Sequence, residues 1–345
     1  MSKYLVTGAA GFIASRVIQQ LLEAGHQVVG VDNLNHAYDI RVKEYRLRKL
    51  LEQPGFRFEK LDISERREVG SLAEGLGEVA AVFNLAARAG VRASVEDPWA
   101  FYETNLTGTL NLLELCKSRG IPKFILASTS SIYGTEAPQP TPETADSSHP
   151  LQPYAASKKA AEALAYSYHY LHGLDATVFR YFTVYGPVGR PDMVIFRFIQ
   201  GIAEGRTVHL NGDGSQSRGF TYVDDIARGT LLGLKPLGYE IINLGGHQVI
   251  TVQALMEMIE NYLGRRARVE RHPAHKADVL TNWADVTRAN SLLGWRPEVD
   301  LEEGVRRTVA WYLAERDWVS RVDTGIESPQ ELPGSANPGL DPAGL

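Results

Sequence analysis

The 345-residue sequence lacks the features that mark secreted, membrane-spanning or nucleic-acid-binding proteins. Its one cysteine, Cys116, excludes an internal disulfide framework and is typical of a reducing compartment. No apolar run approaches the roughly 18 residues that a membrane-spanning helix needs, and no cleavable signal precedes the first strand-like segment. A net charge of −5 gives no support for nucleic acid or an acidic membrane as a partner. We therefore expect a soluble, cytoplasmic protein.

The N-terminal segment has the pattern of a dinucleotide-binding unit. An apolar run at residues 4–6 leads into a glycine turn at 8–14 with the spacing G-x-x-G-x-x-A, then into a helical pattern and a second strand that ends at Asp32. In such units the glycines let the backbone approach a pyrophosphate at a helix N-terminus, and the acidic residue accepts a hydrogen bond from the ribose 2′-hydroxyl. The alternative is a purely structural turn. We expect NAD and not NADP, because Asp32 would repel a 2′-phosphate.

Strand-like and helix-like segments alternate through the first half of the chain. Further strands are predicted at 56–60, 82–87 and 124–127, and a long helix between 99 and 116. An insertion at 33–51 carries an amphipathic helix whose expected apolar face is Leu47, Leu50 and Leu51. This alternation predicts an α/β fold with a doubly wound parallel sheet of the Rossmann type, whose ligands bind at the carboxyl ends of the strands.

The pattern changes near residue 180, where glycine and proline become frequent. We expect residues 1–180 to form the NAD-binding Rossmann domain and residues 181–322 to form a smaller, interleaved C-terminal α/β substrate-binding lobe. Helices are predicted in this lobe up to Leu263 after an N-cap at Thr251, and from about 301 to 318. Residues 323–345 are rich in Pro, Gly and Ser and are expected to be a disordered tail.

Tyr154 and Lys158 stand four residues apart just after Pro153, so both should lie on one face of the first turns of a helix. A cation beside a phenol favours the phenolate and lowers its pKa. Such a pair can take a proton from an alcohol, which then becomes a hydride donor. The alternative is an ordinary surface tyrosine above a lysine.

Several motifs occur together in a characteristic order. They are TGAAGFI at 7–13, DNLN at 32–35, NLAA at 84–87, Asn105, STSSIYG at 128–134, Tyr154 with Lys158, and RYF at 180–182. Together they resemble the extended short-chain dehydrogenase/reductase family of NAD-dependent nucleotide-sugar epimerases and dehydratases. The segments at 30–35, 89–92, 182–187 and 189–193 look most like those of UDP-glucuronate 4-epimerases within that family.

The resemblance implies an isomerase that oxidises C4 of a UDP-sugar with NAD, lets the 4-keto sugar rotate and reduces it on the other face. It implies that Tyr154 is the base, that Lys158 holds the nicotinamide ribose and lowers the Tyr154 pKa, and that Thr129 hydrogen-bonds the reacting oxygen. The cofactor-binding residues implied are Gly8, Gly11, Phe12, Ile13, Asp32, Asn33, Asn35, Asp62, Ile63, Leu85, Ala86, Ala87, Asn105, Ser128, Tyr154, Lys158 and Tyr181. The substrate-binding residues implied are Arg92, Thr129, Ser130, Ser131, Tyr154, Thr183, Arg190, Arg218 and Asp278.

The residues after Thr129 bear on the choice of sugar. Related dehydratases and uronate decarboxylases resembling this chain carry acids there, whereas this chain has Ser130 and Ser131. Hydroxyls at these positions and at Thr183, with the charge of Arg190, could pin a sugar carboxylate; the alternative is that the hydroxyls only satisfy loop backbone. The nucleotide end departs from the family pattern at three positions, Gly219, His275 and Asn211.

Four other functions stay open: a UDP-glucose or UDP-N-acetylhexosamine 4-epimerase, a decarboxylase or other oxidoreductase on the same substrate, an alcohol dehydrogenase using free NAD, and a non-catalytic NAD or UDP-sugar sensor. No metal is expected, because the pairs His169 with His172 and His272 with His275 lack carboxylate or cysteine neighbours. A homodimer is expected, since related enzymes pair through a four-helix bundle. Its apolar stripes would be Leu106, Leu110 and Leu113 on one helix and Ala161, Leu164, Tyr168 and Leu171 on the other.

Overall fold

The computed structural model describes residues 1–246, 248–273 and 281–325. Asp278 and His275, which the family resemblance singled out, lie outside these ranges, as does most of the expected tail. Within the described residues, no helix is long and apolar enough to cross a membrane.

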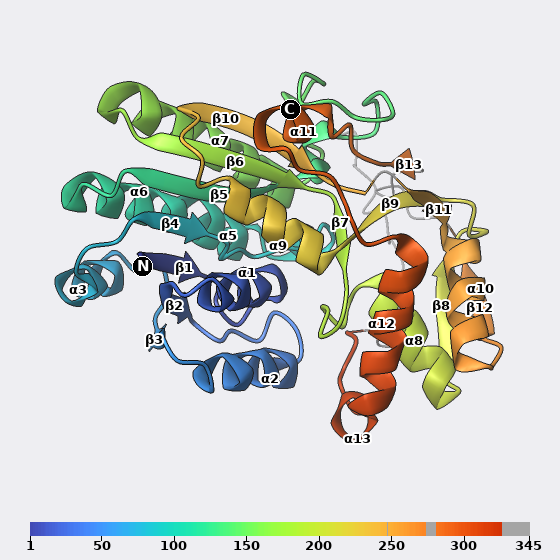
Figure 1. The fold of residues 1–345 in the computed structure, drawn as a ribbon. Coiled ribbons are helices and arrows are strands. Elements are labelled where there is room, and N and C mark those ends of the chain that lie inside the picture. The colour runs from blue at the N-terminus through green and yellow to red at the C-terminus, as the bar shows by residue number, and fades with distance from the viewer. Residues whose placement is uncertain (247, 274–280, 326–345) are drawn as a thin grey trace, which may run out of the picture.

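The larger lobe is built on a seven-stranded parallel sheet (Figure 1). In spatial order its strands are β10 (Tyr239–Leu244), β6 (Asp175–Tyr181), β5 (Lys123–Thr129), β4 (Ala81–Asn84), β1 (Lys3–Thr7), β2 (Gln27–Asp32) and β3 (Phe56–Lys60). The strand order reverses between β1 and β4, and ligands of doubly wound sheets bind at such a reversal. The expected α/β fold is confirmed.

Helices cover both faces of this sheet, and each face has its own apolar core. One face carries α3 (Arg66–Leu76), α6 (Gly108–Arg119) and α7 (Pro153–His172). The other carries α1 (Phe12–Glu23), α9 (Val223–Leu232) and α11 (Thr287–Leu293), with part of α2 (Ile40–Leu51). Since β10, α9 and α11 come from the second half of the chain, the two lobes exchange segments.

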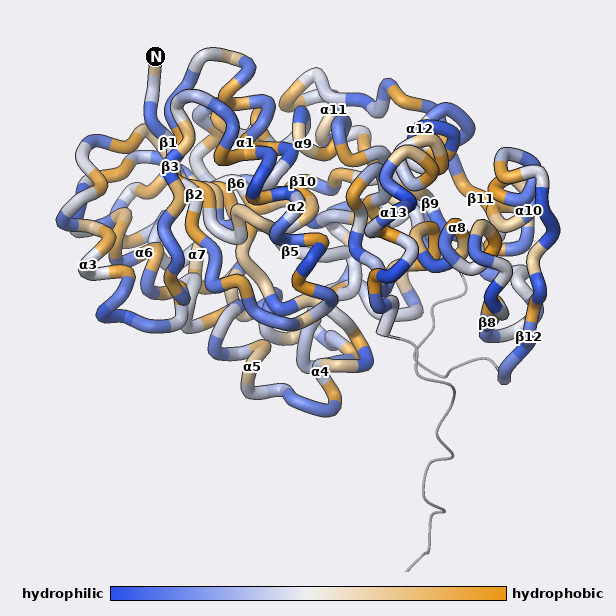
Figure 2. Tube along the Cα trace, turned by 90° about the horizontal axis from the view of Figure 1, so that it is seen from below, coloured by the Kyte–Doolittle hydropathy of each residue, from blue (hydrophilic) through white to orange (hydrophobic). Residues whose placement is uncertain are grey.

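The smaller lobe packs helices against short strands around a third apolar core. Its helices are α8 (Val194–Glu204), α10 (Val252–Leu263), α12 (Leu301–Ala314) and α13 (Arg316–Val319). Its strands are β7 (Thr183–Tyr185), β8 (Thr207–Asn211), β9 (Ser217–Tyr222), β11 (Val249–Thr251), β12 (Arg268–His272) and β13 (Thr281–Asn282). Figure 2 shows hydrophilic and hydrophobic residues alternating along its outer helices, as expected for helices with one buried face.

Short elements complete the chain between β4 and α7. They are α4 (Ala93–Glu96), α5 (Pro98–Tyr102), a π-helical turn (Glu103–Thr107) that joins α5 to α6, and a 3₁₀ turn (Ser130–Tyr133) after β5. The predicted cap of α10 is confirmed, since the Thr251 side chain accepts a hydrogen bond from the amide of Ala254.

Three details differ from the sequence-based expectations. Leu47 and Leu50 are buried as expected, but Leu51 is 58% exposed, and Val42 lies on the buried face of α2 instead. The helix expected over 301–318 is interrupted at Glu315, between α12 and α13. Strand β4 ends at Asn84, and the next residues bend toward β1, where the Ala86 amide donates to the Thr7 hydroxyl.

Candidate active site

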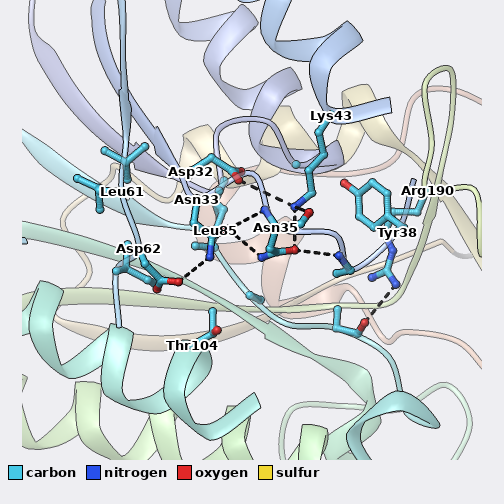
Figure 3. A pocket seen from close by; sticks show the side chains of 18 residues that line it. Asp32, Asn33, Asn35, Tyr38, Lys43, Leu61, Asp62, Leu85, Thr104 and Arg190 are labelled. Atoms are coloured by element: carbon cyan, nitrogen blue, oxygen red, sulfur yellow. Dashed lines mark hydrogen bonds and ion pairs between the residues drawn. The ribbon is translucent and has the colours of Figure 1, made fainter. Parts of the chain in front are cut away.

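A first cavity lies at the carboxyl ends of β1, β2 and β4 (Figure 3). Two residues that line it, Gly8 and Gly11, have no room for a side chain. Gly8 has a φ of +71°, and a Cβ there would come within 2.8 Å of the Ala86 Cα atom. A Cβ on Gly11 would lie 2.7 Å from the carbonyl oxygen of Gly8. The glycine turn therefore presents bare backbone to the cavity.

Helix α1 begins directly after Gly11 and has no side-chain cap. Its first amide groups have no intrahelical acceptors, and the positive end of a helix dipole favours an anion. Gly11 lines both this cavity and the next one. This uncapped helix end fits the pyrophosphate of a dinucleotide.

The acidic end of β2 lies across the cavity from the glycine turn. Buried Asp32 accepts hydrogen bonds from the amides of Ala10 (3.1 Å) and Leu34 (2.8 Å), which fix its carboxylate. The ammonium of Lys43 lies 4.0 Å from this carboxylate and donates to Asn35. Burial lowers the pKa of Lys43, and the charge of Asp32 opposes that shift.

Asn33 and Asp62 join the ends of β2 and β3, since the Asn33 amide donates to the Asp62 carboxylate at 2.6 Å (Figure 3). Burial works to raise the pKa of Asp62, but hydrogen bonds from Ser64 and Asn33 outweigh it, so the pKa is lowered. Polar groups thus surround the position where the fold places a ribose.

A second cavity of about 260 Å³ continues from the first toward the smaller lobe. It brings together Thr129 at the end of β5, Tyr154 and Lys158 on the first turns of α7, and Thr183 on β7. Arg190 lines both cavities. The three expected acid–base residues therefore share one space with two of the expected substrate-binding residues, Thr183 and Arg190.

Tyr154 follows Pro153, the first residue of α7, and its ring packs edge-on against Phe101 with centroids 6.0 Å apart. Burial raises the pKa of Tyr154, while the Thr129 hydroxyl and the charge of Arg190 act in the opposite direction. The expectation that Lys158 lowers this pKa is not met here. Burial dominates, and the opposing charge is that of Arg190.

Lys158 is almost completely buried, and its ammonium donates to the carbonyl oxygen of Ala127 at 3.0 Å. Burial lowers its pKa from 10.5 to about 8, although the charge of Glu162 opposes the shift. The lysine is thus held in place by the end of β5, one residue before Ser128.

A buried ion pair between Arg180 and Glu162 stabilises the region around Lys158. The guanidinium of Arg180 on β6 donates to both carboxylate oxygens of Glu162 on α7, at 2.9 and 2.8 Å. Both side chains are 2% exposed. The Ser128 hydroxyl donates to the same carboxylate at 2.6 Å, and Tyr133 accepts from Arg180. The network ties α7 to β5 and β6 close to Thr129, Tyr154 and Lys158.

Comparison with known proteins agrees with this geometry. The model of the NAD dependent epimerase/dehydratase family matches residues 4–245. The chain belongs to this family. It is 54% identical over 312 residues to a UDP-glucuronate 4-epimerase of Thermodesulfobacterium geofontis, covering 90% of this chain and 96% of that relative.

Two solved structures of the family are also similar over 91% of this chain and 99% of theirs. One is a UDP-glucuronic acid 4-epimerase from Bacillus cereus in complex with UDP-glucuronic acid and NAD, with 34% identity and a TM-score of 0.85. The other is a UDP-glucose 4-epimerase from Thermotoga maritima with UDP-glucose, with 35% identity and a TM-score of 0.84. NAD is the cofactor of the family, and the glycine turn, the uncapped helix and Asp32 of this chain fit it.

Most of the residues expected to bind cofactor or substrate line the two cavities. Those that do are Gly8, Gly11, Phe12, Ile13, Asp32, Asn33, Asn35, Asp62, Ile63, Leu85, Ala86, Ala87, Ser128, Thr129, Tyr154, Lys158, Tyr181, Thr183 and Arg190. Buried Asn105 does not line either one. Its amide bonds the backbone of Arg88 and the hydroxyl of Ser157, so it holds the loop and the helix that form the walls.

The other expected residues that the structure describes line neither of the two cavities. Ser130 accepts a hydrogen bond from Asn282, and Ser131 bonds Thr129. Arg92 is exposed at the start of α4, and Arg218 donates to the carbonyl oxygen of Ser217.

Gly219 stands where the family usually has an acid, and the structure gives the reason for the glycine. A Cβ at this position would come within 2.6 Å of the carbonyl oxygen of Gly246 and 2.9 Å of the Trp283 Cβ. At Gly219, β9 therefore packs too closely against Gly246 and Trp283 to leave room for a side chain.

The cavities also contain residues that were not expected from the sequence, among them Tyr38, Lys43 and Met193. Tyr38 lines both cavities, and the guanidinium groups of Arg46 and Arg190 each lie 5.7 Å from its ring centre. A signal was present, since Lys43 and Arg46 interrupt the apolar face of the helix predicted at 33–51. Basic residues buried on an inner helix face need a partner or a ligand.

Proposed function

We propose that this protein is an NAD-dependent UDP-sugar 4-epimerase whose substrate is UDP-glucuronate and whose product is UDP-galacturonate. The observation that carries the proposal is the second cavity, where Thr129, Tyr154 and Lys158 lie with Thr183 and Arg190. The 54% identity to a UDP-glucuronate 4-epimerase supports it.

In this proposal Tyr154 takes the proton of the sugar 4-hydroxyl and later returns it to the oxygen at C4. NAD, when bound, accepts the hydride from C4 and gives it back to the opposite face of the rotated sugar. Thr129 hydrogen-bonds the reacting oxygen, and Lys158, anchored on Ala127, holds the nicotinamide ribose. Asp32 accepts from the adenosine ribose. The UDP group binds firmly, so that its binding energy retains the ketone while the sugar turns.

The hydroxyl groups near Thr129 account for epimerisation without loss of carbon dioxide. A 4-keto uronate is a β-keto acid, and it decarboxylates when its carboxylate stands perpendicular to the ketone plane. In the proposal Thr183 and Arg190, which line the second cavity, hold the carboxylate away from that orientation, while Ser131 bonds the neighbouring Thr129. None of them is acidic, so none would repel it.

The guanidinium of Arg190 already has hydrogen-bond partners within the protein. Its Nε and Nη2 atoms donate to the Asp192 carboxylate at 3.1 and 2.6 Å, and Nη2 also donates to the Ala89 carbonyl oxygen. A guanidinium has a further nitrogen, Nη1, which can donate to a carboxylate while Asp192 keeps the group oriented.

Arg190→Ala should weaken the binding of UDP-glucuronate by roughly ten- to a hundredfold, because a charge-assisted contact is lost. Binding of UDP alone should change little. The pH optimum should move upward, since the charge that lowers the Tyr154 pKa is gone, and some UDP-pentose should form. Calorimetry with both ligands, a pH–rate profile and NMR of the products measure these effects.

Asp192→Asn is the matched control, because it removes the ion pair and leaves the arginine in place. It should keep most of the affinity for UDP-glucuronate. Equal weakening of UDP and UDP-glucuronate in Arg190→Ala, with no UDP-pentose, would mean that Arg190 binds phosphate or holds its loop.

The nearest alternative is a 4-epimerase of neutral UDP-sugars, favoured by the similarity to the UDP-glucose enzyme of Thermotoga maritima. Incubation with UDP-glucuronate and, separately, UDP-glucose, followed by NMR, decides between them. We expect UDP-galacturonate from the first and little conversion of the second. Carbon dioxide or accumulating NADH would indicate a decarboxylase or a net oxidoreductase, and no reaction would indicate a sensor.

We further infer a homodimer that pairs through α5, α6 and α7. Large apolar side chains are exposed along these helices, among them Trp99 (77%), Tyr170 (76%) and Leu171 (68%). The stripe expected from the sequence needs correction, because Leu113, Ala161 and Tyr168 are buried within the subunit. Exposed aromatic groups of this kind mark interaction surfaces.

Tyr170→Asp should convert the dimer to a monomer, because a buried carboxylate without a partner is costly at an interface. Light scattering at micromolar concentration measures the mass. Leu313→Asp, at a 45% exposed site on α12, is the control and should leave the dimer intact. A wild-type monomer would show that the exposed face serves another purpose.

A further inference from the structure

Strands β8 and β12 form a two-stranded parallel sheet at the outer side of the smaller lobe, beside α10 (Figures 1 and 2). Residues alternate in direction along a strand. Val208 and Leu210 of β8 are buried in the lobe core, so His209 points to the opposite face. The register pairs Glu270 with His209 and places His272 two residues further on.

Three metal-binding groups meet on that face. The Nδ1 atom of His209 lies 2.8 Å from the Nε2 atom of His272. The Glu270 carboxylate lies 3.8 Å from the first of these nitrogens and 3.6 Å from the second. All three ligand atoms lie within 4.8 Å of one another.

We propose that His209, Glu270 and His272 form a site for one divalent transition-metal ion such as Zn²⁺, separate from the active site, which fastens β8 to β12. Two imidazoles and a carboxylate are a common ligand set for this ion. None of the three residues lines either active-site cavity.

The distances suit a small adjustment around an ion. Two nitrogen ligands of a tetrahedral Zn²⁺, each at about 2.0–2.1 Å, stand about 3.3 Å apart. The imidazole nitrogens are 2.8 Å apart, so they need to separate by about half an ångström. The imidazole side chains are 22% exposed and that of Glu270 is 54% exposed, so the carboxylate has room to turn inward.

A surface hollow of about 520 Å³, lined in part by His209 and Glu270, adjoins the site. An ion can enter from there, and water can complete its coordination. Basic side chains also line the hollow, but Arg197 donates to the His209 carbonyl oxygen and Arg206 to that of Ser320. Their charges should keep the affinity below that of closed, four-ligand zinc sites.

The competing explanation is that the two imidazoles simply share a hydrogen bond, with Glu270 nearby. The sequence analysis paired His272 only with His275 and expected no metal, because His209 lies far from Glu270 and His272 along the chain. Only the pairing of β8 with β12 brings these residues together.

The test uses the full-length protein without a histidine tag, treated with EDTA and dialysed. Titration with ZnCl₂ by calorimetry should show one equivalent bound, and Co²⁺ should give the visible absorption of a tetrahedral ion. Zn²⁺ should raise the melting temperature, as any ligand of the native state does. His209→Ala and His272→Ala should each weaken binding at least tenfold and abolish the thermal shift.

His149→Ala is the matched control, because His149 also stands beside a carboxylate, 3.4 Å from Asp146, but without a second histidine. It should bind Zn²⁺ as the wild type does. Glu270→Gln lies at an exposed position and keeps the shape of the side chain, so this variant should fold, and it should also weaken Zn²⁺ binding. It replaces His209→Ala in the test if that variant does not fold.

Wild-type binding no tighter than that of the His209 and Glu270 variants would overturn the proposal and leave a hydrogen-bonded histidine pair. Epimerase activity in EDTA should stay unchanged, so the outcome is independent of the proposed function.

Discussion

Replacing Tyr154 with phenylalanine should lower turnover at least about 100-fold, the effect typical of losing a general base. The Tyr154 phenol lies against Thr129 in the second cavity, where the proposal places the sugar 4-hydroxyl, and phenylalanine lacks the oxygen that would take the proton. The ring and its packing on Phe101 remain, and affinity for UDP should be kept. Initial rates by NMR and calorimetry with UDP measure the two quantities.

Tyr166→Phe, on the exposed side of the same helix, is the control and should retain full activity. If Tyr154→Phe also turned over normally, another group would have to carry the proton, and the proposed mechanism would fail.

Arg180→Met should lower the free energy of unfolding by about 3–5 kcal/mol, the range for breaking one side of a buried ion pair. The change leaves the Glu162 carboxylate, at 2% exposure, without its two guanidinium donors. Ser128 bonds the same carboxylate and lines the second cavity, so the loss also affects the wall of that cavity. Denaturation in urea measures the effect.

Adding Glu162→Gln to Arg180→Met should restore part of the stability, because the buried carboxylate that has lost its guanidinium partner is then removed. Arg316→Met removes an exposed ion pair with Glu204 and should change stability by less than about 1 kcal/mol. A similar small effect for Arg180→Met would show that water reaches Glu162.

Local patterns predicted the larger lobe well, because its signals are short-range. The glycine turn, the acid at the end of β2 and the spacing of Tyr154 and Lys158 each lie within a few residues. A parallel sheet then brings the strand ends together by geometry alone. The 54% identical relative confirms the family that these motifs predicted.

Features that depend on distant contacts were not predictable in this way. The pKa of Tyr154 follows from burial by surrounding elements, which overrides the effect expected from Lys158. Gly219 is explained only by the close approach of Gly246. The cluster at His209 depends on a strand pairing in the smaller lobe, where short elements separated by long connections leave little periodicity to analyse.

Lys158 makes the folding equilibrium itself sensitive to protons. Its pKa is about 8 in the folded protein and near 10.5 in an unfolded chain. Between these values the unfolded chain binds more protons at this position, so stability rises with pH over that interval. Below pH 8 the lysine is charged in both states, and the penalty of burying that charge, on the order of 3 kcal/mol, is felt in full. At neutral pH the fold therefore gives up part of its stability to keep the buried Lys158 ammonium in the second cavity, and such trades between stability and activity are common in enzymes.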